Sequence, residues 1–160
     1  MPKLSVNKTE WDLSPLLRSD EDPKGPLLVE EASKILSSFN AKWQSRTDWL
    51  KEPVALKEAI TEYEKIFAGL GLLGPVSFYL GLRQAQEEDN TELKAKENKI
   101  TDRARKNVEL IRFFEHRLAQ VPEEIQKKFL SDPSLSLYHH YLGRLFIEAR
   151  YLLSEPEEKI

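Results

Sequence analysis

Residues 91–120, TELKAKENKITDRARKNVELIRFFEHRLAQ, decide the fold that this sequence predicts. Asp89 and Glu92 stand at the spacing of a helix-capping pair, so we expect one long helix from about Thr91 to Gln120. Only four residues between positions 92 and 107 are apolar, whereas the second half of the stretch is rich in them. A thin apolar stripe that broadens in this way is typical of a helix that leaves the body of the protein at one end.

The helix before this stretch is expected to run beside it. Glycines and Pro75 interrupt the helical pattern that starts near Pro53, because glycine lowers helix propensity and proline cannot donate a backbone hydrogen bond. A new helix is predicted from Pro75 to about Glu88, and the short turn that follows makes it the antiparallel neighbour of the long helix. The sequence therefore predicts a long antiparallel helical hairpin, a prong with its tip near Asp89 and Asn90.

The rest of the chain has helical patterns too. Apolar residues recur at spacings of three and four over residues 26–43 and 53–70, and a short helix is expected from about Pro122 to Leu130. Asp132 and Pro133 have the residue types of an N-cap and a first helical position, and they open a helix to about Leu153. Because this last helix is apolar on more than one side, we expect it to be central and mostly buried. The predicted fold class is all-α.

Three parts are expected along the chain. Residues 1–25 form an extended tether and a polar loop, residues 26–153 form a helical lobe, and residues 154–160 begin a further helix. Ser154 and Glu157 have the spacing of a capping box, with Pro156 in the first turn. A natural domain seldom ends where a helix has just been capped, so the sequence predicts a chain cut from a longer one.

Composition excludes several classes of protein. The 160 residues include 24 basic and 27 acidic side chains, and a net charge of −3 argues against a nucleic-acid partner. The absence of cysteine excludes disulfides, thiolate zinc sites and cysteine nucleophiles. No segment approaches 18 apolar residues and the first residues lack an apolar signal-peptide run, so we expect no membrane partner and a cytoplasmic location.

No residue of this chain is predicted to be catalytic, to bind a cofactor or to bind a metal. A helical zinc-hydrolase motif needs two histidines four residues apart, and His116, His139 and His140 lack that spacing. Carboxylates such as those of residues 87–89 follow helix surfaces, and none of their spacings singles out a general acid and base. The basic residues from Arg103 to Arg112 alternate with acidic ones and indicate a mixed surface.

Aromatic residues allow two interpretations. Phe113, Phe114, Tyr138, Tyr141 and Tyr151 have helical spacing and are interpreted as core residues. The alternative is that they form a wall against which a peptide binds.

Four stretches of the sequence, by their order and spacing, together resemble a known protein family. They are WDLS at 11–14, LKEAITEYEKI at 56–66, LIRFFEHRL at 110–118 with PEE at 122–124, and residues 138–160, where RYLLSEPEEK at 150–159 is the most telling. Their combination resembles the amino-terminal part of the oligoendopeptidase F family of zinc metallopeptidases, and it covers nearly the whole chain.

The resemblance implies a longer parent protein in which zinc activates water and short peptides are cut in a channel between helical lobes. The H-E-x-x-H helix of that family lies far downstream, so no zinc or catalytic residue is expected in this chain and zinc is implied only for the parent. The chain would then be the non-catalytic amino-terminal lobe that roofs the channel, inactive when isolated. Its partners would be the C-terminal catalytic part of the same polypeptide and, in the parent, oligopeptide substrates.

A free-standing helical interaction module without enzymatic activity is the alternative function. Such a module would bind its partner through the prong or the last helix. The apolar last helix also predicts a weak homodimer with Tyr141, Phe146, Ile147 or Tyr151 at the contact, unless residues 154–160 fold back and cover that surface.

Overall fold

Every regular element between residues 11 and 149 is helical, so the predicted all-α class is confirmed. The computed structural model describes these residues, except for the side chains of residues 68–70 and 72. In chain order the elements are α1 (Lys24–Trp43), the 3-10 helix η1 (Asp48–Leu50), α2 (Pro53–Leu70), η2 (Gly71–Leu73), α3 (Gly74–Gln86), α4 (Thr91–Glu109), α5 (Arg112–Ala119), α6 (Glu123–Ser131), η3 (Pro133–Tyr138) and α7 (His139–Glu148).

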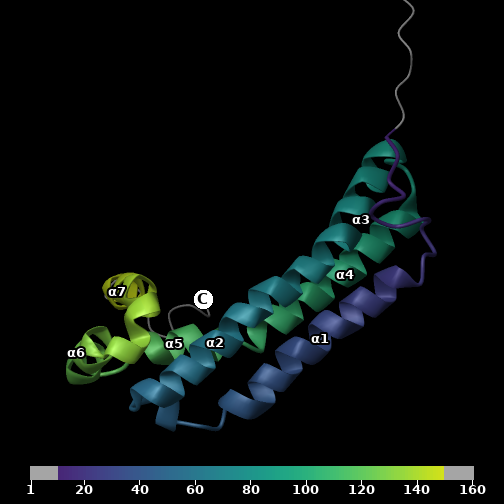
Figure 1. Ribbon diagram of the computed structural model, residues 1–160. Coiled ribbons are helices and arrows are strands. Elements are labelled where there is room, and N and C mark those ends of the chain that lie inside the picture. Colours follow the sequence, from purple (N-terminus) through teal and green to yellow (C-terminus); the bar gives the residue numbers. More distant parts are fainter. Residues whose placement is uncertain (1–10, 150–160) are drawn as a thin grey trace, which may run out of the picture.

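Two regions of packing make up the described part of the molecule. Helices α2 and α3 follow one another along nearly one line, with α1 beside both and α4 beside α3 (Figure 1). Helices α5, α6 and α7 gather at one end, whereas residues 11–23 lie at the other end beside α3 and the start of α4 (Figure 1). The main apolar core lies at the end where α5, α6 and α7 gather, and two smaller apolar clusters lie along α1, α3 and α4.

The two helices of the predicted hairpin pack against each other across the short turn at residues 87–90. Asn90 caps α4, since its side-chain oxygen lies 3.1 Å from the backbone nitrogens of both Glu92 and Leu93. The expected cap at Asp89 is therefore wrong by one residue. The hairpin also differs from a free prong, because α1 packs on both helices and residues 11–23 fold against their tip.

The single long helix expected from Thr91 to Gln120 is wrong. Helix α4 ends at Glu109 and α5 begins at Arg112. The carbonyl of Leu110 accepts a hydrogen bond from the Asn40 side chain of α1, and Ile111 is buried in the main core. This break turns α5 toward the main core while α4 stays against α1 and α3.

Aromatic rings fill the main core. Phe114 is fully buried, and its ring centroid lies 4.8 Å from that of Trp49 and 4.6 Å from that of Tyr63. Phe39 meets the same ring edge-on at 5.5 Å. The interpretation of Phe114 as a core residue is therefore confirmed, and these ring contacts anchor α5 against α1, η1 and α2.

The last helix is neither continuous nor central. Asp132 caps it as predicted, by accepting a hydrogen bond from the Ser134 N–H at 2.9 Å, but its first turns form η3 and only then α7 follows. In Figure 1, α7 lies at one end of the molecule. Its buried residues are Leu142 and Phe146, whereas Ile147 is 58% exposed. The expected burial on most of its circumference is therefore wrong. Tyr151, Leu153 and the predicted capping box at 154–157 lie outside the described residues.

Candidate functional site

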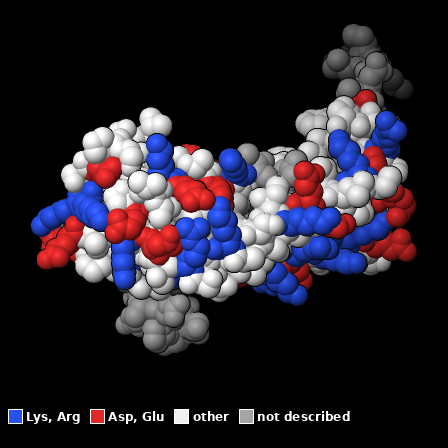
Figure 2. Space-filling model, turned by 60° about the horizontal axis from the view of Figure 1, so that its bottom comes forward, with Lys and Arg blue, Asp and Glu red and all other residues white. Residues whose placement is uncertain are grey.

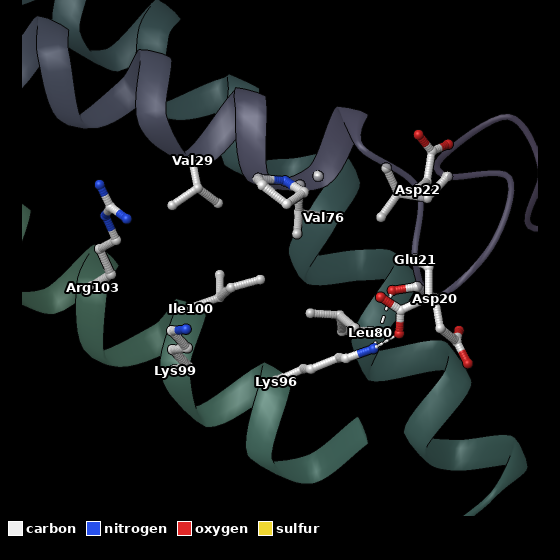
Figure 3. Close-up of a pocket in the computed structure, with 13 residues that line it drawn as sticks. Asp20, Glu21, Asp22, Val29, Val76, Leu80, Lys96, Lys99, Ile100 and Arg103 are labelled. Atoms are coloured by element: carbon white, nitrogen blue, oxygen red, sulfur yellow. Dashed lines mark hydrogen bonds and ion pairs between the residues drawn. The ribbon is translucent and has the colours of Figure 1, made fainter. Parts of the chain in front are cut away.

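A groove of about 280 Å³ lies where residues 17–26 meet α1, α3 and α4 (Figure 3). This volume is near the lower end of the range for small-molecule sites. Five apolar residues from four separate segments line it, and six charged residues surround them. The apolar residues are Leu17, Val29, Val76, Leu80 and Ile100, and the charged ones are Asp20, Glu21, Asp22, Lys96, Lys99 and Arg103.

Helical periodicity builds the α4 wall of the groove. Lys96, Ile100 and Arg103 stand at spacings of four and three, and Lys99 lies next to Ile100, so all four occupy one side of the helix. Figure 3 shows them along this side of α4, with Ile100 between the cations. Sequence reasoning missed this site, because the mixed-surface interpretation includes Arg103 only as one of several surface cations and assigns no role to Lys96 and Lys99. The shared side of Ile100 and its basic neighbours was the signal that could have found it.

The acidic wall is held in place by α3. Asp20 Oδ1 accepts hydrogen bonds from the Tyr79 hydroxyl at 2.7 Å and from Arg83 Nε at 3.0 Å, and Arg83 Nη2 lies 3.2 Å from Asp20 Oδ2. The hydrogen bond from Arg83 is the main cause that holds the pKa of Asp20 below its usual value. Burial, followed by the hydrogen bond to Asp20, raises the pKa of Tyr79 to about 12. These contacts fasten the loop to α3.

The other two carboxylates of this wall also have partners. Asp22 accepts backbone hydrogen bonds from Arg18 at 2.8 Å and from Lys24 at 2.9 Å, and the bond from Arg18 is the main cause of its lowered pKa. The Lys96 ammonium reaches across to the loop, where it pairs with Glu21 and lies 3.4 Å from the Asp20 carbonyl oxygen (Figure 3). The three carboxylates of the acidic wall therefore already have partners within the protein.

The basic wall is organised around Ser33 of α1. Its hydroxyl oxygen accepts hydrogen bonds from Arg103 Nε at 3.2 Å and from Asn107 Nδ2 at 2.8 Å, and the hydroxyl donates to the Val29 carbonyl at 2.8 Å. Asn107 is buried, so this arrangement satisfies a polar side chain between α1 and α4. Within residues 11–149, the structure places no carboxylate in ion-pair contact with Lys99 or Arg103.

The histidines lie away from the groove and from one another. On α5, His116 Nε2 is 3.2 Å from the side-chain nitrogen of Gln120, which follows that helix, and His139 Nε2 is 3.1 Å from the Asp132 carbonyl oxygen. His140 is exposed on α7. Across the part of the chain that the structure describes, no three His, Asp or Glu side chains are grouped as a metal site would require.

The predicted aromatic and carboxylate residues make structural contacts. Tyr138 donates to Glu64 and Tyr141 donates to Glu115, each at 3.0 Å, while Glu87 pairs with Arg83 at 2.8 Å. Burial is the main cause that raises the pKa of Tyr141 well above its usual range. Tyr151 lies outside the described residues, so the alternative of a peptide-binding wall stays untested there.

Charges of both signs cover the surface. On the face that Figure 2 shows, Lys and Arg are interspersed with Asp and Glu. Arg105 pairs with Asp102 at 3.0 Å and Arg112 pairs with Glu109 at 3.4 Å, as a mixed surface predicts. None of the helices between residues 11 and 149 combines the length and the apolar character needed to cross a bilayer.

Comparisons with known proteins point to one family. The family model described as oligopeptidase F matches residues 117–160. The oligoendopeptidase F homolog of Lactococcus lactis subsp. lactis (strain IL1403) is 22% identical over 156 residues, which are 97% of this chain and 25% of the relative. The plasmid oligoendopeptidase F of Lactococcus lactis subsp. cremoris is 22% identical over 154 residues, which are 96% of this chain and 24% of the relative.

The chain thus spans about a quarter of the length of these curated relatives. No solved structure matches it. The two relatives and the family model confirm the resemblance that the four stretches of sequence predicted: the chain is similar to the amino-terminal lobe of the oligoendopeptidase F family.

Proposed function

We propose that this chain is the non-catalytic amino-terminal lobe of a longer zinc-dependent oligoendopeptidase, and that it roofs the channel in which short peptides are hydrolysed. The observation that carries the proposal is the coverage of the relatives, since nearly all of this chain matches only a quarter of each. The chemistry would then lie in the remaining part of the polypeptide.

The side chains described here do not fit a zinc site. His116, His139 and His140 each have separate surroundings, and no cluster of three ligand-type side chains occurs in residues 11–149. We therefore assign the metal to the remaining part of the parent and derive no step through it from this lobe. The lobe's role would be to position that part and to limit what enters the channel.

Exposed apolar side chains offer surfaces for contact with the remaining part. Phe67 on α2 and Phe78 on α3 are more than half exposed, and Leu137 of η3 and Ile147 of α7 are exposed at the other end of the described chain. Large exposed apolar residues of this kind commonly mark contact sites when they gather in patches. The homodimer and the cytoplasmic location remain predictions.

Expression of the two parts separately and together tests this proposal. The parent gene should encode an H-E-x-x-H motif downstream of Ile160. We expect the isolated 160-residue chain to bind no zinc and to cleave no quenched fluorescent oligopeptide. The downstream part should bind zinc, and addition of the lobe should change which peptide lengths it cleaves. Chelator-sensitive cleavage by the isolated chain would overturn the proposal, and a downstream sequence without the motif would favour the interaction module.

A further inference from the structure

The groove beside α4 combines an apolar floor with one wall of unpaired positive charge. Val29, Val76 and Leu80 are buried residues from α1 and α3 that form part of the floor. Lys99 and Arg103 lie one turn apart on α4, so both cations stand at the same wall. A ligand for this groove therefore needs an apolar body, and its charge is decided by which of the two walls is free.

The acidic wall has little capacity for another cation. The Asp20 carboxylate already accepts hydrogen bonds from Tyr79 and Arg83, while the carboxylate of Glu21 pairs with Lys96. The Asp22 carboxylate accepts two backbone N–H groups. A cationic ligand would have to displace these internal partners.

The basic wall keeps its capacity for an anion. Arg103 donates a hydrogen bond through Nε to the Ser33 hydroxyl oxygen. Its two terminal nitrogens have no hydrogen-bond acceptor among the described residues. Glu30, on the neighbouring helix, pairs with Lys34 at 2.8 Å, and the effect of Arg103 on its pKa is minor beside that of Lys34. Ser33, which also accepts a hydrogen bond from Asn107, holds the Arg103 side chain at the wall before any ligand arrives. This arrangement favours an anionic group such as a carboxylate, because a guanidinium and an ammonium donate strong hydrogen bonds to it.

We propose that this groove binds small molecules that carry one carboxylate on an apolar body. The carboxylate contacts Lys99 and Arg103, and the body lies on Val29, Leu80 and Ile100. Two sources share this chemistry, a peptide that ends in an apolar residue and a fatty acid. The proposal uses only the groove and does not depend on the oligoendopeptidase assignment.

Matched pairs of ligands test the proposal with the whole 160-residue chain. We would titrate N-acetyl-leucine and octanoate, and then their uncharged amides, while recording two-dimensional ¹H–¹⁵N NMR spectra. We expect at least one of the two carboxylate ligands to cause saturable shifts at residues of the groove. The matching amide should bind at least about tenfold more weakly. Tighter binding of N-acetyl-leucine would identify the peptide source, and tighter binding of octanoate the fatty-acid source.

Charge variants on α4 supply the second arm of the test. Lys99→Ala and Arg103→Ala should each weaken carboxylate binding several-fold, whereas Lys94→Ala should leave it unchanged, since Lys94 is an exposed cation of α4 that does not line the groove. All three positions are exposed, so the variants are expected to fold, which circular dichroism checks. Equal binding of acids and amides, equal effects of all three variants, or no saturable shift with any ligand would each overturn the proposal.

Discussion

Arg83 donates two hydrogen bonds to Asp20, at 3.0 and 3.2 Å, and so ties the loop that follows Leu17 to helix α3. The two residues lie 63 positions apart, and both side chains are less than one-third exposed. This contact places the acidic wall of the groove and buries Leu17 in the apolar cluster with Val76 and Leu80.

Asp20→Asn should destabilise the protein. The amide nitrogen of asparagine cannot accept the bond from Arg83 Nη2, and a hydrogen bond to a charged group contributes about 1.5–3 kcal/mol to the free energy of unfolding. Urea denaturation measures the change. Asp102→Asn is the matched control, since Asp102 pairs with Arg105 on an exposed face and should matter little. A loss no larger than that of the control would contradict a stabilising role for Asp20.

Acid should weaken this contact in a predictable pH window. The pKa of Asp20 is lowered in the folded state, so the folded protein binds fewer protons there than the unfolded chain, whose aspartate pKa is about 3.9. The stability from Asp20 is therefore fully present above pH 4 and is lost as pH falls through the folded-state pKa. Urea midpoints of wild type and Asp20→Asn should converge as pH falls below about 4. A constant difference across this range would contradict the lowered pKa.

Removal of the Phe114 ring should be far more damaging than removal of an exposed ring. Phe114 is fully buried among Phe39, Trp49 and Tyr63, so Phe114→Ala should cost about 3–5 kcal/mol of unfolding free energy. Phe78 is 68% exposed on α3, and Phe78→Ala should change stability by only about 0.5 kcal/mol. Denaturant unfolding of both variants compares them directly, and similar losses would contradict this placement of the core.

The start of α4 offers a test between adjacent residues. Asn90→Ala should cost about 1 kcal/mol, because the side-chain oxygen of Asn90 accepts the N–H groups of Glu92 and Leu93. Asp89→Ala should have little effect, since Asp89 is exposed and is not the cap. Thermal or urea unfolding of the two variants measures this, and a larger loss from Asp89→Ala would return the cap to the position that the sequence predicted.

Local chemistry explains which parts of the fold were predictable. Periodic apolar residues indicated the helices, and Asp132 followed by Pro133 indicated where the last helical segment begins, because capping and periodicity involve residues only a few positions apart. By the same argument, Ile100 and its basic neighbours on α4 could have been recognised as one wall of a site.

The sequence by itself determined the all-α class and the starts of α2 and α4, since turn and helix propensities act locally. Only the tertiary structure decided the break after α4, where the Asn40 side chain of α1 donates a hydrogen bond to the Leu110 carbonyl and the main core buries Ile111. It also decided the groove, because Tyr79 and Arg83 bring Asp20 to α3 across some sixty residues of chain. Contacts between residues so distant in sequence leave no periodic pattern, and they form only when the packed helices bring those residues together.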